Sequence, residues 1–188
     1  NSGAISGDGS LTVAAGATTL AGANTYTGTT TVTGGSLELQ NGGAIADTGA
    51  VVVNAGTLTV TDAETIGSLA GSGGTVQMDD NLTTGGNNTS TSYGGVLAGT
   101  GTFEKTGSGT MTLTGTNTAN GTTTVSGGTL TVSGSIASAV VAVTNAATLN
   151  VDGTSLADTA AVTLSNSPAS SARWAMAKSG NMPRPSIP

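Results

Sequence analysis

Pairs of carboxylates are the side chains of this sequence that come nearest to a catalytic arrangement. Asp62 and Glu64 stand two residues apart, and Asp80 directly follows Asp79. Glycoside hydrolysis uses two carboxyl groups that face each other about 5–10 Å apart, and residues i and i+2 of a strand share one face. We nevertheless expect both pairs to be solvated residues of turns or strand ends, since Gly, Asn and Asp favour turns.

The rest of the composition excludes most other catalytic chemistry. The chain has neither His nor Cys, so nucleophilic triads and zinc sites built on these residues are absent. Lys105 is the only basic residue before Arg173, which leaves little to stabilise the carbanion of a polysaccharide lyase. We therefore predict that the chain is not an enzyme, and we assign no catalytic, cofactor-binding or metal-binding residue and no cofactor.

Calcium is the metal ion whose preference for oxygen ligands best suits this composition. Asp79, Asp80 and Asn81 form the one dense group of side-chain oxygens in the sequence. The segment SGDG at 6–9 is similar to calcium-binding nonapeptide repeats, yet its Asp is not repeated, because position 100 is Thr. A structural calcium ion near Asp79 and Asp80 stays an open alternative.

Pairs of the form Thr-x-Thr suggest a surface of ordered hydroxyl groups. Such ladders on a β-solenoid can order water and bind ice, provided that the pattern is in register on every coil. Glu38, Asn150 and Val52 interrupt it, and Thr suits exposed strand positions in general, so ice binding is only an alternative. The pairs are Thr29/Thr31, Thr57/Thr59, Thr110/Thr112 and Thr122/Thr124.

Two further sets of residues carry little information about partners. Three Asn-x-Ser/Thr patterns match the N-glycosylation motif, but a chain rich in Thr and Asn contains such matches by chance. The aromatic residues of the main body are too sparse to form a hot-spot cluster. The motif asparagines are Asn81, Asn88 and Asn120, and the aromatic residues are Tyr26, Tyr93 and Phe103.

The charge balance limits the partners of the chain. Its formal net charge is −6 at a sequence pI near 4.1, and an acidic surface repels phosphate backbones and anionic lipids. We predict no nucleic-acid partner, and no membrane insertion, because no run of about 18 apolar residues occurs. The sequence starts at Asn1 without Met or a signal peptide, so we expect a mature or excised fragment.

A long internal repeat is the strongest signal in the sequence. GANTYTGTTTVTGGSLEL at 22–39 recurs as GTNTANGTTTVSGGTLTV at 115–132 with a constant offset of 93 residues. The flanking blocks recur at offsets of 92 and 91, so a unit of about 90 residues is present nearly twice. Asn24 and Asn117 occupy equivalent turns in this unit, and we expect them to serve the backbone geometry of those turns.

Short apolar–polar–apolar triplets recur inside this unit. Their period-2 alternation places Leu and Val on one face of a strand and the polar residue on the other. Gly, Asn and Asp bracket the triplets, and no window shows sustained helical periodicity, so an all-β fold is predicted. The triplets are Leu11-Thr12-Val13, Leu37-Glu38-Leu39, Leu58-Thr59-Val60, Met111-Thr112-Leu113, Leu130-Thr131-Val132, Leu149-Asn150-Val151 and Val162-Thr163-Leu164.

The spacing of the triplets predicts a β-solenoid. Leu37, Leu58 and Val76 follow one another at roughly 18 to 26 residues, the length of one coil, and would stack about 4.8 Å apart. A lone coil buries too few aliphatic side chains to offset the entropy of ordering about 20 residues, so the coils must stack. A β-sandwich is the alternative, and it would show longer strands joined by hairpins.

The last 22 residues differ from the rest. All four Pro residues lie at 168 and beyond, and Arg173, Trp174, Lys178 and Arg184 cluster there. We predict a β-helical part at 1–166 and a non-repeat tail at 167–188, which would be a linker, a cloning remnant or a cap.

Four segments carry a family resemblance: 22–39, TIGSLAGSGGTV at 65–76, GVLAGTGTFEKTGSGTMTLTGTNT at 95–118, and GTTTVSGGTLTV at 121–132. In order and spacing they resemble the passenger-associated β-strand repeat of bacterial autotransporters, over roughly residues 3–151. The resemblance implies a right-handed parallel β-helix exported across the outer membrane of a Gram-negative cell, and a repeat that is scaffold without catalytic residues. An extra Gly at Gly73-Gly74 and Ala119 in place of the Tyr seen at Tyr26 depart from the pattern, and we expect both to be tolerated turn changes.

Together these features predict a non-enzymatic, extracellular β-helical stalk or adhesin segment of an autotransporter-type surface protein. It would support adhesion to an unknown host or bacterial surface ligand, or self-association. The alternatives are a structural filament in which open solenoid ends stack, a polysaccharide-acting enzyme and an ice-binding solenoid.

Overall fold

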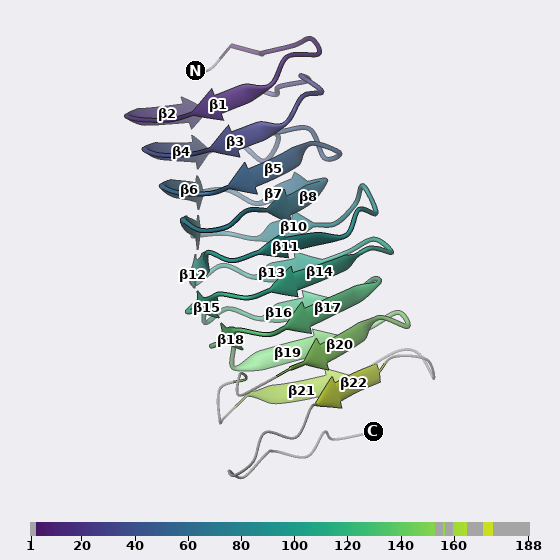
Figure 1. The fold of residues 1–188 in the computed structure, drawn as a ribbon. Coiled ribbons are helices and arrows are strands. Elements are labelled where there is room, and N and C mark those ends of the chain that lie inside the picture. The colour runs from purple at the N-terminus through teal and green to yellow at the C-terminus, as the bar shows by residue number, and fades with distance from the viewer. Residues whose placement is uncertain (1–2, 153–155, 157–159, 165–170, 175–188) are drawn as a thin grey trace.

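The chain folds as a stack of parallel β-strands. A computed structural model describes residues 3–152, 156 and 160–164, and the backbone of residues 171–174. These residues contain no helix and form a parallel β-solenoid of about eight turns, so the predicted β-helix is confirmed and the β-sandwich is wrong. Figure 1 shows the coils stacked from β1 at one end to β21 and β22 at the other. Each coil has up to three strands, and the stacked strands make three faces.

Face 1 is the longest of the three. Its strands pair in parallel in two sheets, β1-β3-β5-β8 and β11-β14-β17-β20-β22, which a bridge between Gly71 and Tyr93 joins. The strands are β1 Leu11–Val13, β3 Thr30–Val32, β5 Ala50–Val53, β8 Ser68–Ala70, β11 Thr91–Tyr93, β14 Thr110–Leu113, β17 Thr129–Val132, β20 Thr148–Val151 and β22 Ser171–Trp174.

Face 2 follows face 1 along each coil. Its main sheet has the order β12-β9-β6-β4-β2, and the short strands β15 and β18 continue the stack. The strands are β2 Ala17–Leu20, β4 Ser36–Leu39, β6 Thr57–Val60, β9 Thr75–Met78, β12 Val96–Gly99, β15 Thr116–Asn117 and β18 Ser135–Ile136.

Face 3 closes each coil but has strands only from the third coil onward. Its sheet has the order β21-β19-β16-β13-β10-β7. In the first two coils, residues 24–26 and 43–45 take this place without forming strands. The strands are β7 Glu64–Ile66, β10 Leu82–Thr84, β13 Phe103–Lys105, β16 Thr123–Val125, β19 Val140–Val143 and β21 Ala161–Leu164.

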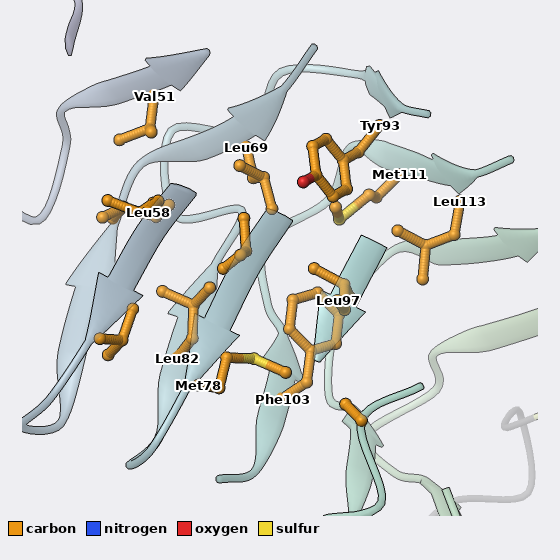
Figure 2. Close-up of a cluster of buried hydrophobic side chains, with 14 of the residues drawn as sticks. Val51, Leu58, Leu69, Met78, Leu82, Tyr93, Leu97, Phe103, Met111 and Leu113 are labelled. Atoms are coloured by element: carbon orange, nitrogen blue, oxygen red, sulfur yellow. The ribbon is translucent and has the colours of Figure 1, made fainter. Parts of the chain in front are cut away.

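The inward side chains of the three faces form one core. In β4, Leu37 and Leu39 are fully buried, whereas Glu38 between them lies outward. The predicted column is confirmed, because Leu37 pairs in register with Leu58, and Leu58 with Val76. Figure 2 shows how apolar side chains of the middle coils, such as Leu58, Leu82 and Phe103, gather in the same interior.

Glycines at the corner between faces 1 and 2 allow the coils to approach. Gly35 has φ 65°, and a Cβ there would lie 2.3 Å from the carbonyl oxygen of Gly16 in the coil before. Gly56 repeats this relationship, since its Cβ would lie 2.4 Å from the Gly35 carbonyl oxygen. The corner at 71–74 contains the extra glycine of Gly73-Gly74. It still ends on a residue with positive φ, Gly74, so the fold accommodates the additional residue.

The sequence repeat is out of phase with the coils. Thr30–Val32 in β3 and its copy Thr123–Val125 in β16 differ by 93 residues, but β3 belongs to face 1 and β16 to face 3. One coil takes about 20 residues, so the offset corresponds to about four and two-thirds coils. Equivalent segments therefore lie on different faces.

Backbone pairing extends past residue 166. Strand β22 pairs in parallel with β20, from Thr148 opposite Ser171 to Val151 opposite Trp174. The other residues of the predicted tail at 167–188 lie outside the described part of the chain, so the division at 166 stays a prediction.

Candidate functional site: buried polar links between coils

Asn24 is buried and links three coils through its side chain. Its Oδ1 accepts a hydrogen bond from the Ile5 N–H of the coil before, at 2.7 Å. Its Nδ2 donates to the carbonyl oxygen of Gly22 at 2.9 Å and to that of Ala44, in the coil after, at 2.7 Å. Because face 3 has no strands at this level, the amide group replaces hydrogen bonds that a strand ladder would make.

Asn117 forms the same link on face 2. Its Oδ1 accepts from the Leu97 N–H at 2.9 Å, and its Nδ2 donates to the carbonyl oxygens of Gly115 at 3.1 Å and Ser135 at 2.8 Å. The sequence predicted equivalent turns at Asn24 and Asn117 but only a local role in backbone geometry. The structure shows a wider role, because each amide bonds to the coils on both sides.

The departure from the repeat at Ala119 is compensated one coil later. In the first copy, the buried Tyr26 hydroxyl lies 2.5 Å from the Thr30 hydroxyl. In the second copy Ala119 offers no hydroxyl, and Thr123, the equivalent of Thr30, pairs with the buried Ser138 hydroxyl at 2.7 Å. Both buried threonines are thus satisfied, as most buried polar groups in proteins are.

Glu64 was expected to be solvated, and this expectation is wrong. The residue is 3 % exposed at the start of β7, and its carboxylate accepts the N–H groups of Ile45 at 2.8 Å and Ala44 at 3.2 Å. Burial raises the pKa of Glu64, the two N–H groups oppose that rise, and the Asp47 carboxylate adds to it. Ala44 is therefore held from both sides, by Asn24 through its carbonyl and by Glu64 through its N–H.

The two carboxylate pairs of the sequence differ in their surroundings. Asp62 is exposed at a corner and accepts the Asn41 N–H at 2.9 Å, while Glu64 is turned into the interior. Asp79 and Asp80 are exposed as expected, and they accept hydrogen bonds from Gln77 Nε2 and from the Asn81 N–H, both at 2.7 Å. Both hydrogen bonds come from residues within two positions of the aspartate, so both side chains serve local backbone geometry.

No candidate metal centre emerges in the described part of the chain. It contains no group of three or more Asp, Glu, His or Cys residues placed to hold a metal ion. Asn81, the third residue of the candidate calcium cluster, accepts a hydrogen bond from the Thr102 hydroxyl at 2.5 Å. The cluster thus offers side chains that already have protein partners.

Lys105, an isolated basic residue in the sequence, is buried in the structure. It is 1 % exposed on the inward side of β13. Its ammonium group donates to the carbonyl oxygens of Thr106 at 2.5 Å and of Gly107 and Gly127, both at 3.3 Å. Burial lowers the pKa of Lys105, because removal from water disfavours the charged form.

Thr84 lies beside Lys105 and has an unsatisfied hydroxyl. The two residues pair in register on neighbouring strands, and Thr84 is 1 % exposed. Among the described residues, its Oγ1 is the buried side-chain oxygen or nitrogen that finds no hydrogen-bond partner. A hydroxyl buried in this way destabilises the fold.

The other residues considered from the sequence are structural or dispersed. Tyr26, Tyr93 and Phe103 are buried in the interior and are not available to a partner. The Thr-x-Thr pairs lie on all three faces, because Thr29/Thr31 and Thr110/Thr112 belong to face 1, Thr57/Thr59 to face 2 and Thr122/Thr124 to face 3. Of the motif asparagines, Asn81 and Asn88 accept hydrogen bonds from neighbouring coils, and Asn120 is exposed.

Two segments of this chain match a family model described as passenger-associated-transport-repeat, at residues 15–39 and 103–132. The first contains Asn24 and the second Asn117. The resemblance found in the sequence is confirmed at these residues: the chain carries passenger-associated-transport repeats in a β-solenoid, as a segment of an autotransporter passenger domain does. No curated protein and no solved structure was found to match the chain. Among the described residues, no helix has the length and hydropathy needed to cross a bilayer.

Proposed function

We propose that this chain is a non-enzymatic spacer within a surface protein exported as an autotransporter passenger, and that it supports adhesion or self-association outside the cell. The observation that carries the proposal is the combination of passenger-associated-transport repeats with a solenoid in which buried polar side chains connect neighbouring coils. Asn24, Asn117 and Glu64 each use their side chains to connect coils. Repetition of this kind gives a scaffold that can be lengthened coil by coil.

The absence of enzymatic activity is part of this proposal. Asp62 and Glu64 are two residues apart in the sequence, but the fold leaves Asp62 exposed and buries Glu64. A glycosidase would need two carboxyl groups facing a common substrate. Incubation of the purified chain with acidic and neutral polysaccharides tests this point: release of oligosaccharides that is lost in Asp79→Ala or Asp62→Ala would overturn it.

Surface display tests the spacer function. The chain is placed between a signal peptide and an autotransporter barrel in a Gram-negative host, and antibody binding to intact cells reports its exposure. We expect exposed chain, and faster cell settling or stronger attachment than for cells that carry the barrel alone. Chain that remains inside the cell would overturn the proposed export. Exposed chain with neither settling nor attachment would overturn the adhesive role.

A further inference from the structure

Face 1 is free of charged side chains over its eight strands from β1 to β20. These strands read LTV, TTV, AVVV, SLA, TSY, TMTL, TLTV and TLNV. Their outward residues are short and uncharged, and include Thr31 in β3 and Thr112 and Thr131 in β14 and β17. Strand β22 is left out of this surface, since its side chains lie outside the described residues.

The adjoining corner between faces 1 and 2 is also uncharged through the first seven coils. Its segments consist of small, uncharged residues, mostly Gly, Ala, Ser, Thr and Asn, at 14–16, 33–35, 54–56, 71–74, 94–95, 114–115 and 133–134. The first charge met at this corner is Asp152, which follows β20. Face 1 and this corner thus form one continuous neutral surface.

The carboxylates lie elsewhere on the molecule. Glu38 projects from face 2 and Glu104 from face 3. Asp62, Asp79 and Asp80 lie at the corner between these two faces, and Asp8 and Asp47 at the corner between faces 3 and 1. Lys105, the one basic residue before Arg173, is buried. Outside face 1 and this corner, the exposed charges of the described residues are therefore all negative, and two copies that met through face 2 or face 3 would bring Glu38 or Glu104 of each copy together.

We propose that face 1 is the surface through which two copies of this chain associate side by side. This inference rests on the proposed function and assigns its self-association to one face. Two copies that meet through this surface bring no charged strand residues together, and the nearest carboxylates, Asp8, Asp47 and Asp152, lie at its margins. The outward Thr, Ser and Asn side chains supply hydrogen-bond donors and acceptors, and Val52 and Ala70 supply small apolar contacts between them.

The size of the face indicates a weak, reversible contact. Four residues of strand span about 13 Å, and eight strands stack over about 38 Å, so roughly 500 Å² of each copy is available. Stable dimers bury more than about 1,200 Å² in total, which two such faces do not reach. Many copies displayed on one cell would multiply this contact through avidity.

Sedimentation of the purified chain over a concentration series tests the proposal. The variant Thr31→Glu/Thr131→Glu adds two charges to face 1, on coils too far apart to repel each other. The matched control Thr65→Glu/Thr163→Glu adds the same two charges to face 3. Circular dichroism and thermal unfolding verify that all variants fold.

We expect the wild type and the control to associate, and the face 1 variant to associate at least tenfold more weakly. Mixing it with Thr31→Lys/Thr131→Lys should restore association, because opposite charges then meet across the contact. Added salt should strengthen wild-type association by screening the net charge of −6. Equal association of the face 1 variant and the control would overturn the choice of face. A monomeric wild type at all concentrations would overturn self-association and leave the spacer function standing.

Discussion

Asn24 and Asn117 make the same three hydrogen bonds although they lie on different faces of the solenoid. Each side chain accepts one N–H from the coil before, and donates to a glycine carbonyl two residues earlier and to a carbonyl of the coil after. The repeat is therefore a local unit that fits at least two faces: at Asn24 the amide links coils where face 3 has no strands, and at Asn117 it does so from β15 on face 2.

Removal of the Asn117 amide should destabilise the middle coils. Asn117→Ala leaves the Leu97 N–H and the Ser135 carbonyl without their partner, and we expect the free energy of unfolding to fall by about 3 kcal/mol. Urea unfolding measures this change, and hydrogen exchange should show faster exchange at the Leu97 amide. The exposed Asn120→Ala serves as control, with a change within about 0.5 kcal/mol. Unchanged exchange at Leu97 would show that the link contributes nothing.

Gly35 should be required for two reasons, its positive φ and the close approach of the Gly16 carbonyl oxygen. Gly35→Ala places a Cβ at φ 65° and 2.3 Å from the Gly16 carbonyl oxygen, and we expect a loss of about 2 kcal/mol or more. Gly43→Ala is a matched control, because the atom nearest to its Cβ lies 4.0 Å away. Thermal unfolding of both variants measures the difference. Equal unfolding temperatures would mean that the corner can shift to accommodate a methyl group.

Glu64 should make stability depend on pH in the acidic range. Its folded pKa is raised above 4.5 by burial, so the folded state binds a proton more readily than the unfolded state. Its contribution to stability is therefore largest at low pH and declines as pH rises through the folded pKa. Relative to Glu64→Gln, the wild type should gain unfolding free energy on acidification from about pH 7 to pH 4, a range that reaches below the ordinary pKa of 4.5. A difference that stays constant over this range would contradict the raised pKa.

The sequence predicted the strands because their alternation is local. A triplet such as Leu37-Glu38-Leu39 needs only its own three residues to show which side chains are buried, and stacking then follows from the spacing to Leu58. The face on which a copy of the repeat lies was not predictable in this way. It depends on the summed lengths of all intervening coils, which vary, as 21 residues separate Leu37 from Leu58 but 18 separate Leu58 from Val76.

The buried polar residues were harder to predict because the strand boundaries decide them. Asp62 and Glu64 look equivalent in sequence, but β7 begins at Glu64, which makes this residue inward and leaves Asp62 at the corner. For Lys105 a signal existed: at the offset of 92 residues it aligns with Val13, an inward residue of β1. The alignment predicts burial, against the general preference of Lys for solvent.

The orphan hydroxyl of Thr84 should be dispensable. Thr84→Val keeps the shape of the side chain and removes a buried oxygen that has no partner, so we expect unfolding free energy to rise by about 1 kcal/mol. Thr83→Val, on the outward side of the same strand, is the control and should change stability little. Chemical denaturation of the two variants gives the comparison. A loss of stability in Thr84→Val would indicate that the hydroxyl is bonded in solution.

Lys105 should make stability rise with pH in the alkaline range. Burial lowers its folded pKa below 10.5, so between the folded pKa and 10.5 the unfolded state binds more protons than the folded state, and the folded state gains stability as pH rises. Lys105→Met fills a similar volume without a titrating group and should lack this slope. Because the raised pKa values of Tyr26 and Tyr93 affect both proteins alike, the difference between wild type and Lys105→Met isolates the lysine. Urea unfolding from about pH 7 to pH 10 measures it, and parallel curves for the two proteins would mean that the ammonium group is as well solvated in the fold as in the unfolded chain.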